Sequence, residues 1–375
     1  MVKKVIEGSH AVAEAVKLCE PKVIAAYPIT PQTHIIERIS EMVADGEMDA
    51  KFVNAESEHS AMSICLGAQA TGVRTFTSSA SQGLALMYEV LYIVSGMRLP
   101  VVMVVANRSL SAPLNIWNDW SDSFGARDSG WIQLYCESVQ EAVDTVIQAY
   151  KIAENESVSL PVMVCIDGFF LSHVYEPVDI PEKTLVKRFL PPYKGRVIDF
   201  DKPISQGMWA GPDYYQEFKK AQHKAMENAK DVIKKTNSEF KKIFKRSYGN
   251  GLIETYNMEK AKYALITMGS LAGTAKYVLK TKNIKDIGLI RIKSFRPFPV
   301  EEIKNSIKDL EGVGVLEKDI SPGLGGALCY ELRGLTKKKN VSTFVGGLGG
   351  RDVKIEDFMK IFKYIREERG ELIWV

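Results

Sequence analysis

The chain has 375 residues, of which 46% are hydrophobic, and its formal net charge is +3. That length allows two ordinary α/β cores, so we expect more than one domain. So small a charge gives no reason to expect nucleic-acid binding, and the sequence shows neither a cleavable signal nor an apolar stretch long enough to span a membrane. The five cysteines have no C-x-x-C spacing, which predicts a reduced, cytoplasmic protein without an iron–sulfur cluster of its own.

In the first 200 residues, short apolar runs alternate with amphipathic helical patterns. The runs that predict strands are 23–27, 51–54, 74–77, 101–105 and 162–166. The patterns that predict helices are 11–18, 34–43, 58–70, 84–94 and 141–155. This alternation is typical of a doubly wound α/β domain with a parallel sheet, which we expect over residues 1–200.

The rest of the chain divides into an excursion and a second block. Residues 201–248 combine a surface excursion with a long polar helix over 214–244, whose mixed charges over 219–246 read as a solvated face. From 249 to 375 the alternation restarts, with strands expected at 263–267, 287–292 and 313–316. The sequence therefore predicts a second, smaller α/β domain.

Polar motifs directly follow the first four predicted strands. Because the carboxyl ends of parallel strands meet at one edge, these motifs should form one site. They contain the candidate residues Pro28, Ile29, Thr30, Glu58, Ser81, Gln82 and Arg108.

The residue types at this edge exclude several chemistries. We find no His/Cys cluster for a metal, no Gly-x-Ser-x-Gly elbow and no Gly-rich phosphate loop after the first strand. The glycine runs 323–326 and 346–350 do not fit the dinucleotide pattern G-x-G-x-x-G either, and we expect them to form tight turns with close backbone packing. What remains is the carboxylate of Glu58, several hydroxyls and amides, and the guanidinium of Arg108.

Nine strings in order resemble the alpha subunits of the 2-oxoacid:ferredoxin oxidoreductase family, which includes pyruvate:ferredoxin oxidoreductase (pyruvate synthase). They are YPITPQT, ESEHSA, TSSASQGLALM, ANRSLSAP, NIWNDWSDSFGARDSGWIQ, MGSLAGTAK, RPFPVEEI, EKDISPGLGGA and GGLGGRDV. The resemblance covers nearly the whole chain. It implies a thiamin-diphosphate pyrimidine-type domain followed by a transketolase C-terminal-like domain. The implied reaction is the reversible oxidative decarboxylation of pyruvate with coenzyme A, yielding acetyl-CoA, CO2 and electrons for ferredoxin.

In the resembled family a glutamate hydrogen-bonds N1′ of the cofactor's aminopyrimidine ring and so activates it. Counted back from Gly67, that position falls on Glu58 rather than Glu56. From spacing alone, Glu58 could also be an ordinary glutamate favoured by the dipole at a helix N-terminus.

The resemblance assigns Arg108 to the carboxylate of the 2-oxo acid, with Thr30 close to the same group. A guanidinium suits this task because its planar fork of donors matches a carboxylate. Two alternatives stay open: a salt bridge from Arg108 to Asp119 or Asp122, and a turn hydroxyl at Thr30 that bonds its own backbone.

The remaining candidates would line the pyrimidine pocket. Pro28 and Ile29 belong to the turn after the first strand, and Ser81 and Gln82 follow the third. Helix capping is the alternative for Ser81. At residue 10 the family often has Glu, whereas this chain has His, so we assign His10 no cofactor role.

The cofactor-binding motifs that this sequence lacks imply that partner subunits supply them. No Gly-Asp-Gly metal–diphosphate motif occurs, and 166–168 is the nearest string. The resemblance implies that a beta subunit supplies the Mg²⁺ and diphosphate site, and that iron–sulfur clusters lie only on partner subunits. Beta, gamma and delta-type subunits, ferredoxin, pyruvate and coenzyme A are therefore expected partners, with no nucleic acid and no membrane.

Three other hypotheses remain. A branched-chain 2-oxo acid such as 2-oxoisovalerate could replace pyruvate, since pocket size depends on side chains that the sequence cannot place. The chain could instead be a noncatalytic scaffold, or a nucleotide-binding electron-transfer protein, which the missing phosphate loops disfavour.

Overall fold

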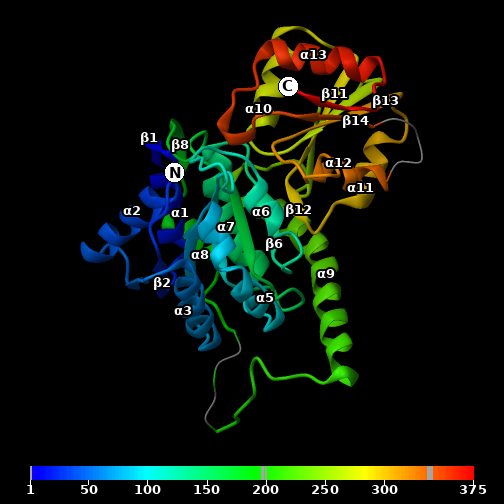
Figure 1. Cartoon of the computed structure of the whole chain (residues 1–375). Helices are drawn as coiled ribbons and strands as arrows, with labels where there is room; N and C mark the ends of the chain where they lie inside the picture. Colours follow the sequence, from blue (N-terminus) through cyan, green and yellow to red (C-terminus); the bar gives the residue numbers. More distant parts are fainter. Residues whose placement is uncertain (1, 196–197, 199–200, 336–340) are drawn as a thin grey trace.

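A computed structural model describes residues 2–195, 198, 201–335 and 341–375 of the chain. Its helices surround two large β-sheets, which lie in different parts of the molecule, and a third sheet has two strands (Figure 1). The first sheet belongs mainly to the first 200 residues, and the second belongs to the C-terminal part.

The first sheet has seven strands in the order β12-β6-β7-β5-β4-β2-β3. All neighbours run parallel except β12, which pairs antiparallel with β6. The strands are β2 Val23–Ala26, β3 Lys51–Asn54, β4 Thr75–Ser79, β5 Val102–Asn107, β6 Ile132–Tyr135, β7 Val162–Asp167 and β12 Ser294–Arg296. Every residue of β5 and β7 is buried, which explains why both read as continuous apolar runs.

Helices cover both faces of this sheet, so the predicted doubly wound fold is confirmed. Along β5, Val102 and Val104 pack with α1 and α7 on one face, whereas Met103 and Val105 pack with α3 and α5 on the other. The helices of this part are α1 Gly8–Cys19, α2 Thr33–Ala44, α3 Glu58–Ala70, α4 Ser81–Leu86, α5 Tyr88–Gly96, α6 Ser121–Gly125, α7 Val139–Ala153 and α8 Lys183–Phe189. The prediction of a single helix over 84–94 is wrong, because the helix breaks at Met87 into α4 and α5.

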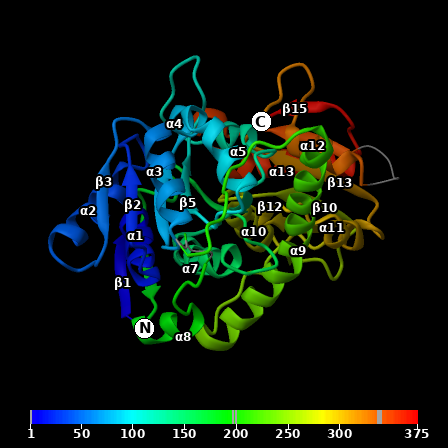
Figure 2. The same cartoon turned by 90° about the horizontal axis from the view of Figure 1, so that it is seen from below.

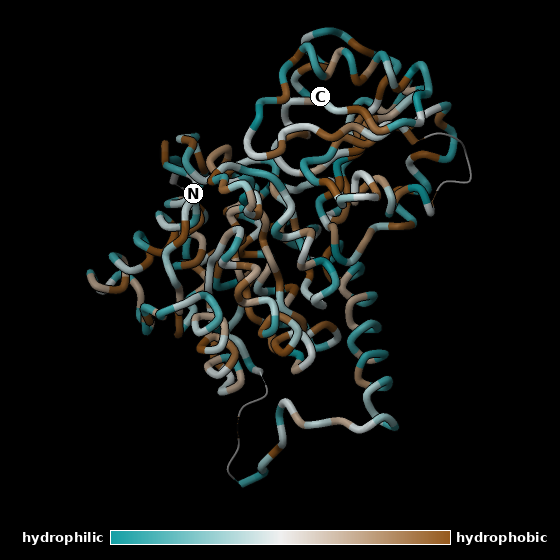
Figure 3. The backbone as a smooth tube through the Cα atoms, in the orientation of Figure 1, coloured by the Kyte–Doolittle hydropathy of each residue, from teal (hydrophilic) through white to brown (hydrophobic). Residues whose placement is uncertain are grey.

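Two further elements flank the sheet. Strands β1 (Val2–Glu7) and β8 (Tyr175–Ile180) form an antiparallel ribbon. Helix α9 (Pro212–Phe244) matches the predicted polar helix, and hydrophilic and hydrophobic residues alternate along it (Figure 3). Its C-terminal end packs beside α8, where Phe240 and Phe244 contact Phe189 (Figure 2).

The second sheet confirms the predicted C-terminal α/β unit, with the strand order β15-β14-β13-β10-β11-β9. Only β9 is antiparallel to its neighbour. The strands are β9 Ile253–Tyr256, β10 Tyr263–Thr267, β11 Ile287–Ile292, β13 Gly312–Glu317, β14 Val341–Val345 and β15 Leu372–Trp374. The helices are α10 Leu271–Thr281, α11 Val300–Ile307, α12 Ala327–Arg333, α13 Ile355–Arg366 and the 3₁₀ turn η1 Leu348–Gly350.

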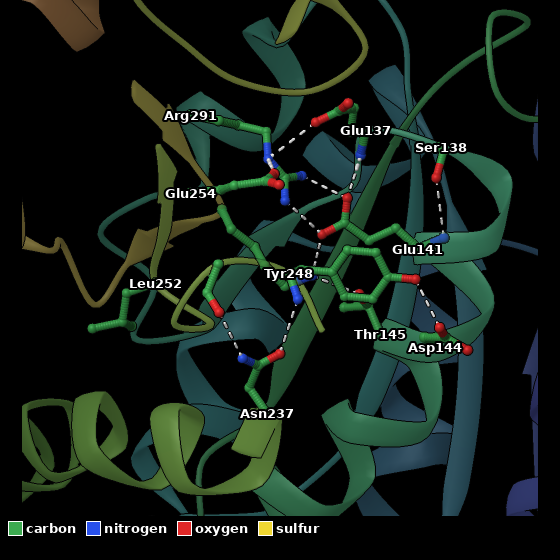
Figure 4. Close-up of polar contacts among 12 residues, drawn as sticks. Glu137, Ser138, Glu141, Asp144, Thr145, Asn237, Tyr248, Leu252, Glu254 and Arg291 are labelled. Carbon is green, nitrogen blue, oxygen red and sulfur yellow. Dashed lines mark hydrogen bonds and ion pairs between the residues drawn. The ribbon is translucent and has the colours of Figure 1, made fainter. Parts of the chain in front are cut away.

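A buried ionic network joins strand β11 of the second sheet to helix α7 of the first part (Figure 4). The guanidinium of Arg291 on β11 binds both oxygens of Glu141 on α7, at 2.5 and 3.0 Å, and Lys293 Nζ lies 2.7 Å from Glu141 Oε1. Burial alone would raise the pKa of Glu141, but Arg291 and Lys293 lower it to about 2. Removing one partner would leave a buried charge uncompensated, so this network holds the two parts together.

Strand β12 crosses the boundary between the two parts. It follows β11 in the chain but pairs with β6 of the first sheet. The division into 1–200, 201–248 and 249–375 therefore stays a prediction, with β12 as the segment that leaves its own block.

Candidate active site

The predicted motifs come together where the order of strands reverses. Strand β2 lies between β3 and β4, so the chain leaves β2 toward one side and then returns to pair β4 on the other. In open α/β sheets, such a switch point forms a crevice beyond the carboxyl ends of the strands. The candidate residues from β2, β3, β4 and β5 all follow these ends.

Glu58 is the first residue of α3 and is only 5% exposed. Ser57 caps the helix by accepting a hydrogen bond from the backbone N–H of Ser60, at 3.2 Å, so Glu58 is not needed as a cap. Burial raises the pKa of the Glu58 carboxyl group, and its own backbone N–H opposes that shift. In the described part of the chain, no side chain donates a hydrogen bond to this carboxyl group.

A glycine allows helix α4 to approach Glu58 closely. A Cβ atom on Gly83 would lie 2.4 Å from Glu58 Oε1 and 2.5 Å from Ser79 Oγ. Ser79 Oγ is itself buried and has no hydrogen-bond partner among the described residues. Among the described residues, no side chain donates a hydrogen bond to the Glu58 carboxyl group and the Ser79 hydroxyl has no partner, so together they form a site suited to a polar ligand.

Ser81 and Gln82 lie in the first turn of α4, beside this pair. The Ser81 hydroxyl lies 2.5 Å from Gln82 Oε1 and also donates to the Ser109 carbonyl oxygen. The alternative that Ser81 caps a helix is wrong, because Ala80 is the N-cap and no side chain caps α4.

Arg108 leaves β5 at the same edge and is buried. Its Nη1 donates to the Thr30 carbonyl oxygen at 3.0 Å, and its Nε donates to the Asn115 carbonyl oxygen at 2.9 Å. The structure thus brings Arg108 and Thr30 together, as expected. Burial lowers the pKa of Arg108, and Asp122 opposes that shift.

The predicted alternative of a salt bridge from Arg108 to Asp119 or Asp122 is wrong. Within the described residues, no carboxylate pairs with the guanidinium. Asp122 instead accepts the backbone N–H groups of Ser81 and Arg108, at 2.9 and 3.0 Å, and the side-chain amide of Asn107 at 2.7 Å. Burial raises the pKa of Asp122 to about 6.

Asp122 therefore fixes the turn after β4 against the end of β5. Gln32 plays the same role on the other side of β4: its Nε2 donates to the carbonyl oxygens of Tyr27 and Ser78, at 3.1 and 2.7 Å. The turn with exposed Pro28 and half-buried Ile29 is thereby tied to β4. Sequence analysis missed Gly83, Ser79 and Gln32, and named Asp122 only as a salt-bridge partner.

The glycine run 346–350 packs on the loop that positions Arg108. The Gly349 carbonyl oxygen accepts from Asn115 Nδ2 at 3.1 Å, and the Gly350 N–H donates to the Asn118 carbonyl oxygen at 2.7 Å. A Cβ on Gly350 would lie 2.4 Å from the Cβ of Trp117. The predicted close backbone packing of this run is confirmed, and it places the C-terminal part against the candidate site.

None of the helices in the described part of the chain is both long and apolar enough to cross a membrane.

Comparisons with known proteins match the chain along most of its length. Residues 14–238 match the family described as pyruvate flavodoxin/ferredoxin oxidoreductase, thiamine diphosphate-binding, and residues 261–358 match the pyruvate:ferredoxin oxidoreductase core domain II. Pyruvate synthase subunit PorA of Methanocaldococcus jannaschii is 55% identical, over 99% of this chain and 97% of that protein. Ketoisovalerate oxidoreductase subunit VorA of Pyrococcus horikoshii is 43% identical, over 99% and 96%.

A solved structure shares the fold. The 2-oxoglutarate:ferredoxin oxidoreductase from Magnetococcus marinus superimposes with a TM-score of 0.75 at 22% identity. The match covers 98% of this chain but 65% of that one, so this chain spans slightly less than two thirds of the larger protein.

Proposed function

Since this chain belongs to the pyruvate flavodoxin/ferredoxin oxidoreductase family, we propose that it is the alpha subunit of a thiamin diphosphate-dependent pyruvate:ferredoxin oxidoreductase. The reaction is the reversible oxidative decarboxylation of pyruvate with coenzyme A to acetyl-CoA and CO2, with electrons passed to ferredoxin. Pyruvate is favoured over a branched-chain 2-oxo acid because the pyruvate synthase relative is 55% identical and the ketoisovalerate relative 43%.

The observation that carries the proposal is the buried carboxyl group of Glu58, to which no side chain of the described residues donates a hydrogen bond. Burial raises the pKa of this carboxyl group, so it holds a proton more readily than an ordinary surface glutamate does. Such a group can donate that proton to N1′ of an aminopyrimidine ring. The neighbouring unpartnered Ser79 hydroxyl offers a second polar contact, so the site fits the pyrimidine half of thiamin diphosphate.

Thiamin diphosphate, when bound, supplies the electron sink for decarboxylation. Glu58 would hold the proton at N1′ and keep the ring in its reactive tautomer. Gly83 leaves room for the carboxyl group, while Ser81, Gln82, Pro28 and Ile29 would line the pocket around the ring.

Arg108 would bind the carboxylate of pyruvate. Its contacts to the carbonyl oxygens of Thr30 and Asn115 hold the guanidinium in place and leave Nη2 and one hydrogen of Nη1 for a ligand. A buried cation without an anionic partner is costly, and the substrate carboxylate would compensate it. Thr30 would lie beside the same carboxylate.

In the part of the chain that the structure describes, the string nearest to Gly-Asp-Gly is not free to hold the cofactor's diphosphate and metal. Asp167, in the string nearest to Gly-Asp-Gly, is engaged by Lys318 Nζ at 3.0 Å and by Trp120 Nε1 at 2.9 Å, so it is not available to a magnesium ion. We therefore assign the diphosphate and Mg²⁺ to a beta-type subunit. Iron–sulfur clusters belong on gamma or delta-type partner subunits, in a cytoplasmic complex that reduces ferredoxin.

Activity of the assembled complex tests this proposal. The purified complex should reduce a low-potential dye when given pyruvate and coenzyme A, and should use 2-oxoisovalerate far less well. The isolated chain should be inactive and bind thiamin diphosphate poorly, although it is folded. Pyruvate-dependent dye reduction by the isolated, folded chain would contradict the assignment of the diphosphate and metal site to another subunit. A complex that prefers 2-oxoisovalerate would contradict the assignment of pyruvate as the substrate.

A further inference from the structure

Three potential metal ligands from distant parts of the sequence meet beside the β1–β8 ribbon. Glu7 ends β1, His34 lies in the first turn of α2, and His173 lies in the connection between β7 and β8. One ligand atom from each lies within 4.8 Å of the other two. This cluster shares no residue with the candidate active site.

The distances are close to those of a coordination shell. Glu7 Oε1 and His34 Nδ1 are 2.7 Å apart, and the rings of His34 and His173 have centroids 4.6 Å apart. Two ligands of a tetrahedral zinc ion lie about 3.3 Å from each other, given bond lengths near 2.0–2.1 Å. To surround an ion, the three ligand atoms, now within 4.8 Å of one another, would adjust toward this spacing.

The ring of His173 is held from outside the cluster. The hydroxyl of Ser172 lies 2.7 Å from His173 Nδ1 and also accepts the backbone N–H of Phe169 at 2.8 Å. The Phe169 ring packs against His173, with centroids 4.7 Å apart. Metal-binding histidines usually have one ring nitrogen fixed by such a hydrogen bond, which leaves the other nitrogen for the ion.

The charge of the cluster also favours a cation. Glu7 is 6% exposed, and within the described residues it has no lysine or arginine partner. Among these residues its ionic contact is His34, which is charged only when protonated.

We propose that Glu7, His34 and His173 bind a divalent first-row transition-metal ion of the zinc type. Two imidazoles and one carboxylate are ligands that Zn²⁺ prefers, and three protein ligands leave a position for solvent. The ion would tie the β1–α1 junction to α2 and to the β7–β8 connection. It would therefore stabilise this corner of the first sheet.

Titration of the full chain with Zn²⁺ against a chromophoric chelator tests the proposal. We expect one equivalent to bind, and expect His34→Gln and His173→Gln each to weaken binding at least tenfold. His59→Gln is the matched control, because His59 also faces a glutamate, Glu89, at 3.7 Å but has no third ligand. This variant should bind Zn²⁺ like the wild type.

Glu7→Gln is a second variant that is expected to keep the fold, because its amide oxygen can still accept a hydrogen bond from His34 while the charge is lost. It should also weaken Zn²⁺ binding at least tenfold, with an unchanged circular dichroism spectrum. Titration with Co²⁺ identifies the ligands: visible d–d absorption without near-ultraviolet thiolate bands is expected, since all five cysteines are buried.

Three results would overturn the proposal: a wild type that binds no Zn²⁺, equal affinities in the wild type and the His34 and His173 variants, or Co²⁺ spectra with thiolate bands. Each readout is independent of enzyme activity.

Discussion

Replacing Gly83 by alanine should disable the site by displacing the carboxyl group of Glu58, although Gly83 itself contributes no side chain to the site. The new Cβ would lie 2.4 Å from Glu58 Oε1, whereas ordinary contact begins at 3.4 Å, so the carboxyl group must retreat by about 1 Å. Ser79 Oγ, at 2.5 Å on the other side, prevents the methyl group from moving away. A misplacement of about 1 Å can cost a catalysed step roughly 10²-fold.

The assay is exchange of the C2 proton of thiamin diphosphate in the assembled complex, followed by NMR in deuterated water. We expect Gly83→Ala to slow this exchange roughly 10²-fold and to destabilise the chain by about 1–3 kcal/mol, as overpacking does. Gly67→Ala is the matched control, because Gly67 lies in α3 with no atom within 4 Å of a new Cβ. Equal exchange rates in the two variants would refute the close approach of α4 to Glu58.

The other variants test the substrate contact, the interdomain packing and a buried acid. Arg108→Lys should lower kcat/KM for pyruvate about tenfold to a hundredfold, with little change in cofactor affinity, since a fork of donors becomes a point charge; lost cofactor affinity with an unchanged pyruvate KM would contradict this. Gly350→Ala should lower the thermal midpoint more than Gly323→Ala, because both glycines have positive φ but only the first meets Trp117; equal midpoints would contradict the packing. Burial raises the pKa of Glu317 from 4.5 to about 8, so the folded chain holds a proton that the unfolded chain releases, and stability should fall as the pH rises through this range. Glu317→Gln should flatten that part of the thermal-midpoint profile, and an unchanged slope would contradict it.

Strands β5 and β7 could be predicted because all their residues are buried, so both appear in the sequence as apolar runs. Strands β3, β10 and β11 have the predicted bounds, and β5 and β7 begin within one residue of them. Strand β12 has three residues and β15 has three, too few for a periodic pattern, and β12 also pairs with a strand more than 150 residues away. Only tertiary contacts could reveal these two.

The residues of the proposed site also fall into two groups: those that the sequence could indicate and those that only the folded structure reveals. Glu58 and Arg108 could be named because each lies after a predicted strand and because the family resemblance assigns a role to each position. Gly83 could not, because its role depends on the distance between two helices. The spacing of Glu7, His34 and His173 matches no metal-binding motif, so that cluster exists only through the pairing of β1 with β8 and the packing of α2.

Proton exchange in Glu58→Gln tests the central claim most directly. The amide keeps the size of the side chain but cannot act as an acid toward N1′, so exchange of the C2 proton in the assembled complex should slow by roughly 10²-fold or more. Thiamin diphosphate should still bind, which separates activation from affinity. Exchange at the wild-type rate in the cofactor-loaded variant would show that Glu58 is structural, and would contradict the proposed role of this chain in the active site.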